Sequence, residues 1–163
     1  MSMLELNHVN KTFNKGTINE KSALKDLTLT MNEGDFVTVI GGNGAGKSTM
    51  LNAIAGVWPI DEGSILINGE DVTGLADYHR AYLIGRVFQD PMMGTAPDMQ
   101  IVENIALAAR RGKSRTLRWG VTANEKEIYR AKLADLHLGL EDRLTQKVGL
   151  LSGGQRQALT LLM

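Results

Sequence analysis

The sequence of 163 residues contains no cysteine, and this absence excludes several kinds of chemistry at once. Disulfides, thiol nucleophiles and thiolate metal sites cannot form in this chain. A reducing, intracellular compartment is the simpler setting for a chain without cysteine. The three histidines are scattered without the spacing of metal ligands, and we assign them no role.

The chain also lacks an excess of charge of one sign and a long apolar run. Lys and Arg together number 18, as do Asp and Glu, so no global field draws the protein to nucleic acid or to an anionic membrane. The longest run without charge, Ser48 to Ile60, is too short and too interrupted by Gly and Pro to span a bilayer. The N-terminal residues lack the basic region and apolar core of a signal peptide. We therefore expect a soluble chain that forms one domain, or part of one, with a real core.

Apolar and polar residues alternate in three segments, which predicts half-exposed strands. The segments are Leu4 to Val9, Leu27 to Met31, and Ile65 to Ile67 with the turn pair Asn68-Gly69 after it. Two other segments are mostly apolar, as buried parallel strands tend to be: FVTVI at 36–40 and IGRVF at 84–88.

The apolar period becomes helical from Ile101 onward. Thr122 and Glu125 have the spacing of a capping box, and Gly139 is a helix stop, so the sequence predicts a helix over Asn124 to Leu138. The order of elements is therefore strands, a nucleotide-type core and a helical block.

A glycine-rich motif, GGNGAGKST, follows the first apolar segment and fits the pattern G-x-x-x-x-G-K-S/T. Glycines let backbone N–H groups converge on an anion, and the helix predicted after the motif adds partial positive charge at its N-terminus. We expect Lys47 to reach the β- and γ-phosphates of a nucleotide and the Ser48 hydroxyl to hold Mg²⁺. A chance glycine-rich turn is the alternative, and the flanking strand and helix argue against it. The candidate nucleotide-binding residues of this phosphate loop are Gly41, Gly42, Asn43, Gly44, Ala45, Gly46, Lys47, Ser48 and Thr49.

A second motif, LSGGQ, spans Leu151 to Gln155 and precedes a helical pattern. A helix that opens with a serine and two glycines presents a hydroxyl and free N–H groups, which is another surface suited to phosphate. The alternative is that Ser152 is an ordinary N-cap, and the two roles are compatible.

With these two motifs the chain resembles the ATP-binding subunit of an ABC transporter, whose signature sequence is LSGGQ. VFQDP at Val87–Pro91 resembles the Q-loop of that family with Gln89, and Phe13 in KTF aligns with its adenine-stacking aromatic. The resemblance implies an α/β, P-loop NTPase fold of the ABC ATPase type. About residues 1–90 would form an antiparallel β subdomain and a parallel-sheet nucleotide core, incomplete here, and about 91–163 a helical subdomain with the signature helix.

The resemblance also implies a head-to-tail homodimer that binds ATP and Mg²⁺ at its interface. Lys47 and Gln89 would be catalytic, and Ser48 and Gln89 would hold the metal. ATP held by Lys47 of one subunit would be covered by a surface of the other, formed by Ser152, Gly153, Gly154 and Gln155. The further partners implied are an integral membrane permease and a substrate-binding protein, with no nucleic acid. The location implied is the cytoplasmic face of the cell membrane, and the helical block is similar to that of bacterial importers, for example those for amino acids.

Several residues keep a second interpretation. Gln89 could be a plain strand-end glutamine, and Phe13 could be core. The methionines after Gln89 could form a surface that re-packs against a moving partner, or fill the core beneath a loop: Met92, Met93 and Met99. A basic segment could meet lipid or an acidic loop, although a solvated face is favoured: Arg110, Arg111, Lys113, Arg115 and Arg118.

Four elements of the family are not found: the strand with the Mg²⁺-binding Asp, the adjacent Glu that polarises water, the loop after it and the switch His. They would lie beyond Met163, so we expect a fragment of a longer protein that is not a competent ATPase by itself. A soluble ABC-type ATPase acting on DNA or ribosomes is the alternative function, and the absence of heptads and of a second phosphate loop argues against it. A nucleotide binder without catalysis is a third possibility.

Overall fold

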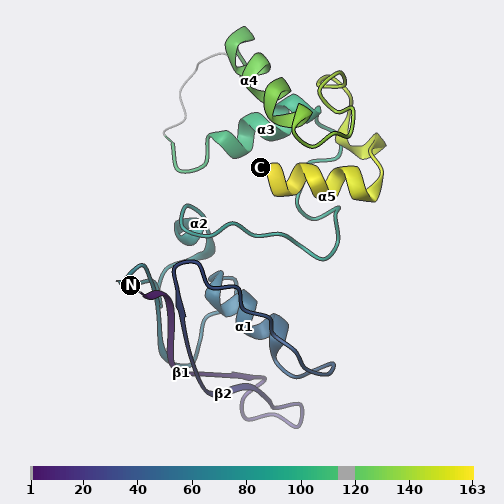
Figure 1. The fold of residues 1–163 in the computed structure, drawn as a ribbon. Coiled ribbons are helices and arrows are strands. Elements are labelled where there is room, and N and C mark those ends of the chain that lie inside the picture. The colour runs from purple at the N-terminus through teal and green to yellow at the C-terminus, as the bar shows by residue number, and fades with distance from the viewer. Residues whose placement is uncertain (1, 114–119) are drawn as a thin grey trace. The chain divides into compact units, whose positions relative to one another are not determined.

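The computed structural model describes residues 2–113 and 120–163, which fall into two compact units, Met1–Gly85 and Arg86–Met163 (Figure 1). The first unit holds the sheet and the phosphate loop, and the second holds the signature motif. No helix in these described ranges is long and apolar enough to cross a membrane.

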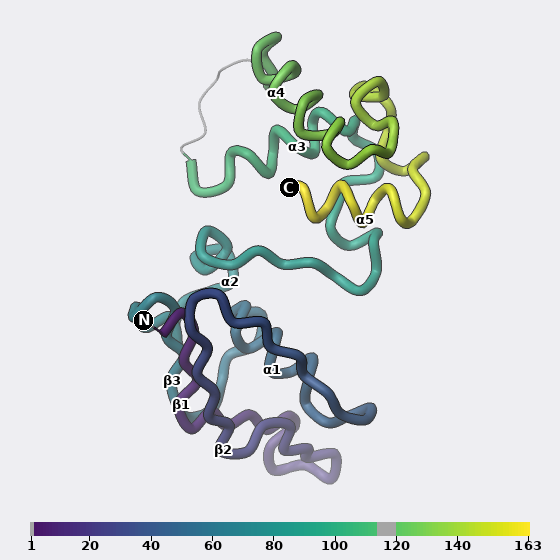
Figure 2. The backbone as a smooth tube through the Cα atoms, viewed as in Figure 1, coloured from purple at the N-terminus to yellow at the C-terminus, as the bar shows by residue number. Residues whose placement is uncertain are grey.

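The first unit is built on a four-stranded antiparallel sheet. Its strands are β1 (Ser2–Phe13), β2 (Lys21–Asn32), β3 (Glu62–Ile67) and β4 (Glu70–Asp71), in the spatial order β2-β1-β3-β4. Figure 2 labels the first three of these strands. The three strands predicted from alternation are confirmed. Asn68 and Gly69 have φ values of 51° and 80°, which is the left-handed backbone that a tight β-hairpin turn requires.

Helix α1 (Lys47–Ile54) covers the sheet with the side chains of Met50 and Ala53. A short helix, α2 (Asp77–Arg80), follows β4. The guanidinium of Arg80 is buried, where it donates to the carbonyl oxygens of Ala53 and Ile54 at the end of α1 at 2.8 and 2.9 Å. The unit's core is formed by Leu6, Val9, Leu24, Met50, Ala53, Ile65, Ile67 and Val72.

The two apolar segments predicted as buried parallel strands are irregular in the structure, so this prediction is wrong for them. Phe36 and Ile40 are 94% and 89% exposed, and Val87 is 45% exposed. A parallel strand is stable only when neighbouring strands satisfy its backbone and other layers cover both faces. Among the described residues no strand runs beside either segment, so their apolar character alone cannot hold them in a sheet.

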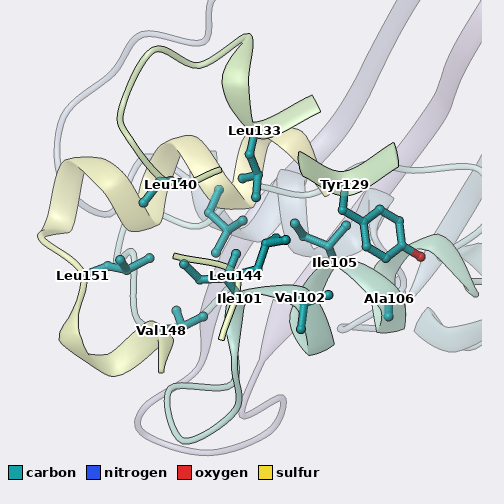
Figure 3. Close-up of a cluster of buried hydrophobic side chains, with 11 residues drawn as sticks. Ile101, Val102, Ile105, Ala106, Tyr129, Leu133, Leu140, Leu144, Val148 and Leu151 are labelled. Atoms are coloured by element: carbon teal, nitrogen blue, oxygen red, sulfur yellow. The ribbon is translucent and has the colours of Figure 1, made fainter. Parts of the chain in front are cut away.

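The second unit is helical. It contains α3 (Ile101–Ala109), α4 (Ala123–Ala134), a short 3-10 helix, η1 (Val148–Leu150), and α5 (Gly153–Leu162). Figure 3 shows Leu133 and Tyr129 of α4 gathered with side chains of α3 and of the segment that precedes the signature motif. Its core consists of Ile101, Val102, Ile105, Ala106, Tyr129, Leu133, Leu140, Leu144, Val148, Leu151 and Leu159.

Helix α4 begins one residue before the predicted start, directly after the predicted cap Thr122, and ends four residues earlier than predicted. The Thr122 hydroxyl accepts from the Glu125 N–H at 3.3 Å, and a Glu125 carboxylate oxygen accepts from the Thr122 N–H at 2.7 Å, so the capping box is confirmed. The hydrogen bond from the Thr122 N–H, and next the one that the Thr122 hydroxyl donates to the same carboxylate at 2.9 Å, lower the pKa of Glu125. The helix ends at Ala134, and the left-handed backbone of His137 (φ 53°) and Gly139 (φ 67°) prevents its continuation.

Candidate nucleotide-binding site

The glycine-rich part of the phosphate loop, residues 41–46, runs directly into the first turn of α1. Gly44 and Gly46 have φ values of 82° and 88°, a region that L side chains rarely adopt. A Cβ atom at Gly46 would also lie 2.4 Å from the carbonyl oxygen of Ala23. Glycine is thus required at residue 46 both by its backbone conformation and by the close approach of the loop to β2.

Lys47 folds back over this loop. Its Nζ donates to the carbonyl oxygen of Gly41 at 2.6 Å and to that of Gly42 at 2.8 Å. An ammonium has three donors and a full positive charge, and the first turn of α1 contains no acidic residue to neutralise it. The loop, the lysine and the helix N-terminus therefore fit an anionic group such as a nucleotide phosphate.

The two hydroxyl residues after Lys47 differ in exposure. Ser48 is exposed on the first turn of α1, so its hydroxyl is available to a metal ion or a phosphate. Thr49 is only 8% exposed, and its part in binding a nucleotide stays a prediction. In the loop itself, Asn43 and Ala45 are exposed.

Phe13 ends β1 and is half-buried outside the apolar core. Its ring meets that of Trp58 edge to face, with 5.1 Å between centroids and 82° between planes, and the Lys11 Nζ lies 5.6 Å from its centroid. Asp61 fastens this end of β1, because its carboxylate accepts from the Thr12 N–H at 2.6 Å and from the Lys11 Nζ at 3.0 Å.

These contacts of Asp61, the Thr12 hydrogen bond first, lower its pKa. The position of Phe13 is consistent with a ring that accepts a base, and that role stays a prediction.

In the second unit, Gln89 is exposed in an irregular segment. Residues 84–88, which lead into it, are irregular, so the interpretation as a strand-end glutamine is wrong. The neighbouring Phe88 is held by its carbonyl oxygen, which accepts from Gln157 Nε2 at 3.4 Å, and by its ring, which lies 4.5 Å from the guanidinium of Arg86. Helix α5 thereby contacts the segment from which Gln89 projects.

The signature motif forms the start of α5, with Ser152 as its N-cap. The Ser152 hydroxyl accepts from the Gln155 N–H at 3.3 Å, and the Gln155 side chain accepts from the Ser152 N–H at 3.2 Å. The N-cap interpretation of Ser152 is therefore confirmed, and Gln155 completes a capping box. Gly153 and Gly154 are exposed, with open space where Cβ atoms would lie, so the backbone of this turn is accessible to solvent.

Arg156 is a site residue that the sequence motifs did not single out. Its side chain is 4% exposed, and its Nη2 donates to the carbonyl oxygens of Val148 and Gly149, each at 3.1 Å. Its Nη1 contacts the Met92 sulfur. Arg156 thus ties the signature helix to the segment before it and to the segment after Gln89. The sequence carries no signal of this role, because an arginine next to a motif is usually exposed.

The exposure of the methionines after Gln89 partly decides whether they form a surface or fill a core. Met92 and Met93 are 53% and 64% exposed, so they do not fill a core, whereas Met99 is half-buried.

In the basic segment, Arg110 pairs with Glu125 at 3.3 Å, and Arg111 and Lys113 are exposed. Arg115 and Arg118 lie outside the described residues.

The structure brings some of the predicted residues together within each unit. In the first unit the phosphate loop lies against the start of β2, whose first residue, Lys21, pairs with Phe13. In the second unit the segment of Gln89 lies against the signature helix. Lys21 has no motif signal in the sequence, since only the fold brings it to the loop.

A family model described as "ABC transporter" matches residues 24–163. The chain is 37% identical to a tyrosine transport ATP-binding protein of Clostridioides difficile over 161 residues, which are 99% of this chain and 64% of that protein. It is also 37% identical to the spermidine/putrescine import ATP-binding protein PotA of Haemophilus ducreyi, covering 98% of this chain and 38% of that protein. The chain therefore spans less than two thirds of the length of these relatives.

Solved structures are similar in fold as well. A nucleotide-free ATP-binding cassette from an ABC transporter has a TM-score of 0.74 at 28% identity, covering 99% of this chain and 64% of that one. A dimeric post-hydrolysis state of an ATP-binding cassette bound to ADP and phosphate has a TM-score of 0.75 at 31% identity, covering 98% of this chain and 68% of that one.

Proposed function

The chain belongs to the ABC transporter family, and from that premise we propose that it is the ATP-binding, energy-coupling part of a membrane transporter. The observation that carries the proposal is the geometry of the phosphate loop. Two glycines with positive φ shape it, and Lys47 closes over it at the start of α1. Exposed backbone, a helix N-terminus and an ammonium are together the groups that hold a nucleotide phosphate.

Each residue of the loop has a proposed role. Lys47 would exchange the carbonyl oxygens of Gly41 and Gly42 for the β- and γ-phosphates. The backbone N–H groups of residues 41–49 would surround the β-phosphate. The exposed Ser48 hydroxyl would ligate Mg²⁺. Gln89 belongs to the other unit, and its role as a metal ligand or as the group that orients water stays a prediction.

We assign the signature turn to a nucleotide held by a second copy of the protein. Ser152, Gly153 and Gly154 present an exposed helix start, and the similar cassette bound to ADP and phosphate is described as dimeric. A two-fold axis would form both sites from the same pair of surfaces. Gln155 would act chiefly by fixing this turn through its capping hydrogen bond.

ATP hydrolysis and transport are proposed for the whole protein, since this chain spans 64% of its tyrosine-transport relative. The partners proposed are an integral membrane permease and a substrate-binding protein, and the location is the cytoplasmic face of the membrane. The tyrosine-transport relative supports an amino-acid-type importer, because it matches 99% of the chain.

Nucleotide binding tests the proposal directly. The affinity of the purified protein for ADP and ATP would be measured by calorimetry with and without Mg²⁺, for the wild type, for Lys47→Ala and for Lys25→Ala. Lys25 is exposed on β2 and serves as the matched control for the loss of one positive charge. We expect Lys47→Ala alone to abolish measurable binding, and equal affinities for all three proteins would contradict the site.

A further inference from the structure

The N-terminal residue of β2, Lys21, places its ammonium on the phosphate loop. The Lys21 Nζ lies 3.3 Å from the point that a Cβ atom would occupy at Gly44. Gly44 has a φ of 82° and lies in the stretch of the loop that leads to Lys47. The loop is therefore approached by a second ammonium besides that of Lys47.

The fold holds Lys21 in this place from two sides. On one side, Lys21 is the direct cross-strand partner of Phe13, at the end of the β1–β2 hairpin where the connecting loop begins and ends. On the other side, β2 touches the loop two residues later, where the Ala23 carbonyl oxygen leaves no room for a side chain at Gly46. The backbone that carries Lys21 is thus fixed relative to both Phe13 and the loop.

The charge of Lys21 is available for a ligand. Lys21 is exposed, and within the described ranges it has no ion pair and no acidic hydrogen-bond partner. A second ammonium against the loop over which Lys47 folds, ahead of a helix N-terminus, adds like charge, which an anion in the loop would relieve.

We propose that Lys21 is a nucleotide-binding residue that contacts the α-phosphate. This inference rests on the proposed nucleotide site and extends it. Phe13 would meet the base and Lys47 the β- and γ-phosphates. Lys21 pairs with Phe13 across the strands and adjoins the loop that Lys47 follows, so it would face the α-phosphate, the one nearest the ribose.

Binding of AMP and ADP to Lys21→Gln tests this assignment, with Lys25→Gln as the control on the same strand. The attraction between an exposed ammonium and a phosphate in water is modest. We therefore expect Lys21→Gln to lower the affinity for both nucleotides by about fivefold at low salt and by less at high salt. Lys25→Gln should leave both affinities unchanged, and Lys21→Arg should restore them. An equal loss in both Gln variants, or no loss for ADP, would overturn the inference, and a loss for ADP without one for AMP would overturn the α-phosphate assignment.

A second measurement reports the location without relying on affinity. Because the chain has no cysteine, Lys21→Cys and Lys25→Cys each introduce a single thiol. ADP should slow maleimide labelling of Lys21→Cys and leave that of Lys25→Cys unchanged, and equal rates with and without ADP at residue 21 would refute the contact. Failure of the proposed function looks different, because the wild type itself would then bind ADP no better than Lys47→Ala.

Discussion

Arg156 of the signature helix donates from Nη2 to the carbonyl oxygen of Gly149, 3.1 Å away in the turn that precedes the motif. The same nitrogen serves the carbonyl oxygen of Val148. A guanidinium that is 4% exposed is costly to desolvate, and these carbonyls offset part of that cost, although its Nε is buried without a hydrogen-bond partner among the described residues. Arg156 therefore sets the angle at which the chain enters Ser152 and α5.

Replacing this arginine should destabilise the second unit. Arg156→Met keeps the length and apolar stem of the side chain but removes two charge-assisted hydrogen bonds, to the carbonyl oxygens of Val148 and Gly149, so we expect a loss of about 2 kcal/mol in the free energy of unfolding. Urea denaturation followed by circular dichroism measures this loss. Arg143→Met, at an exposed position, is the control, and an equal effect of the two substitutions would contradict the role of Arg156.

Gly46→Ala should destabilise the first unit. The new Cβ would lie 2.4 Å from the Ala23 carbonyl oxygen in a residue with a φ of 88°, and the combined clash and backbone strain should cost about 2 kcal/mol or more. Thermal unfolding without nucleotide is the measurement. Gly42→Ala has open space around its Cβ and no positive φ, so its melting temperature should match the wild type.

Ser152→Ala and Thr122→Ala separate capping from phosphate binding. Both residues cap a helix through the same reciprocal hydrogen bonds, so each substitution should cost about 1 kcal/mol of stability. Only Ser152→Ala should weaken ATP-dependent dimerisation, measured by analytical ultracentrifugation of the whole protein. If both variants, or neither, altered the dimer, the proposed contact of Ser152 with nucleotide would be wrong.

Asp61 should make stability depend on pH in the acid range. The Thr12 and Lys11 hydrogen bonds lower its pKa below the usual 3.8, so its contribution is present above that value and is lost as the pH falls through the lower pKa of the folded state. The carboxylate is one third exposed, so the contribution is below about 1 kcal/mol. Asp61→Asn should flatten the fall in unfolding free energy below about pH 4, whereas the exposed Asp98→Asn should not.

Much of the candidate site could be predicted from short stretches of sequence. The turn Asn68-Gly69, the caps at Thr122 and Ser152 and the glycines of the phosphate loop all depend on backbone geometry within a few residues. The strands of the first sheet were predictable for a similar reason, since alternation of apolar residues reflects one buried face. Local physics and the final fold agree at these places.

The apolar segments at 36–40 and 84–88 show where sequence reasoning fails. Their composition predicts burial in a parallel sheet, yet Phe36 is 94% exposed and Val87 45% exposed. A strand is defined by its neighbours, and the described chain places none beside them.

The sequence by itself determined the phosphate loop, the signature motif and the family to which they belong, because each motif is contiguous and encodes its own turn and helix start. Only the tertiary structure decided that Lys21 adjoins Gly44, that Arg80 closes the end of α1 and that Arg156 is buried beneath the signature turn. In the sequence these three residues carry no motif and read as ordinary charged side chains of the surface. Their roles arise from strand pairing and helix packing between distant segments, which no local pattern specifies.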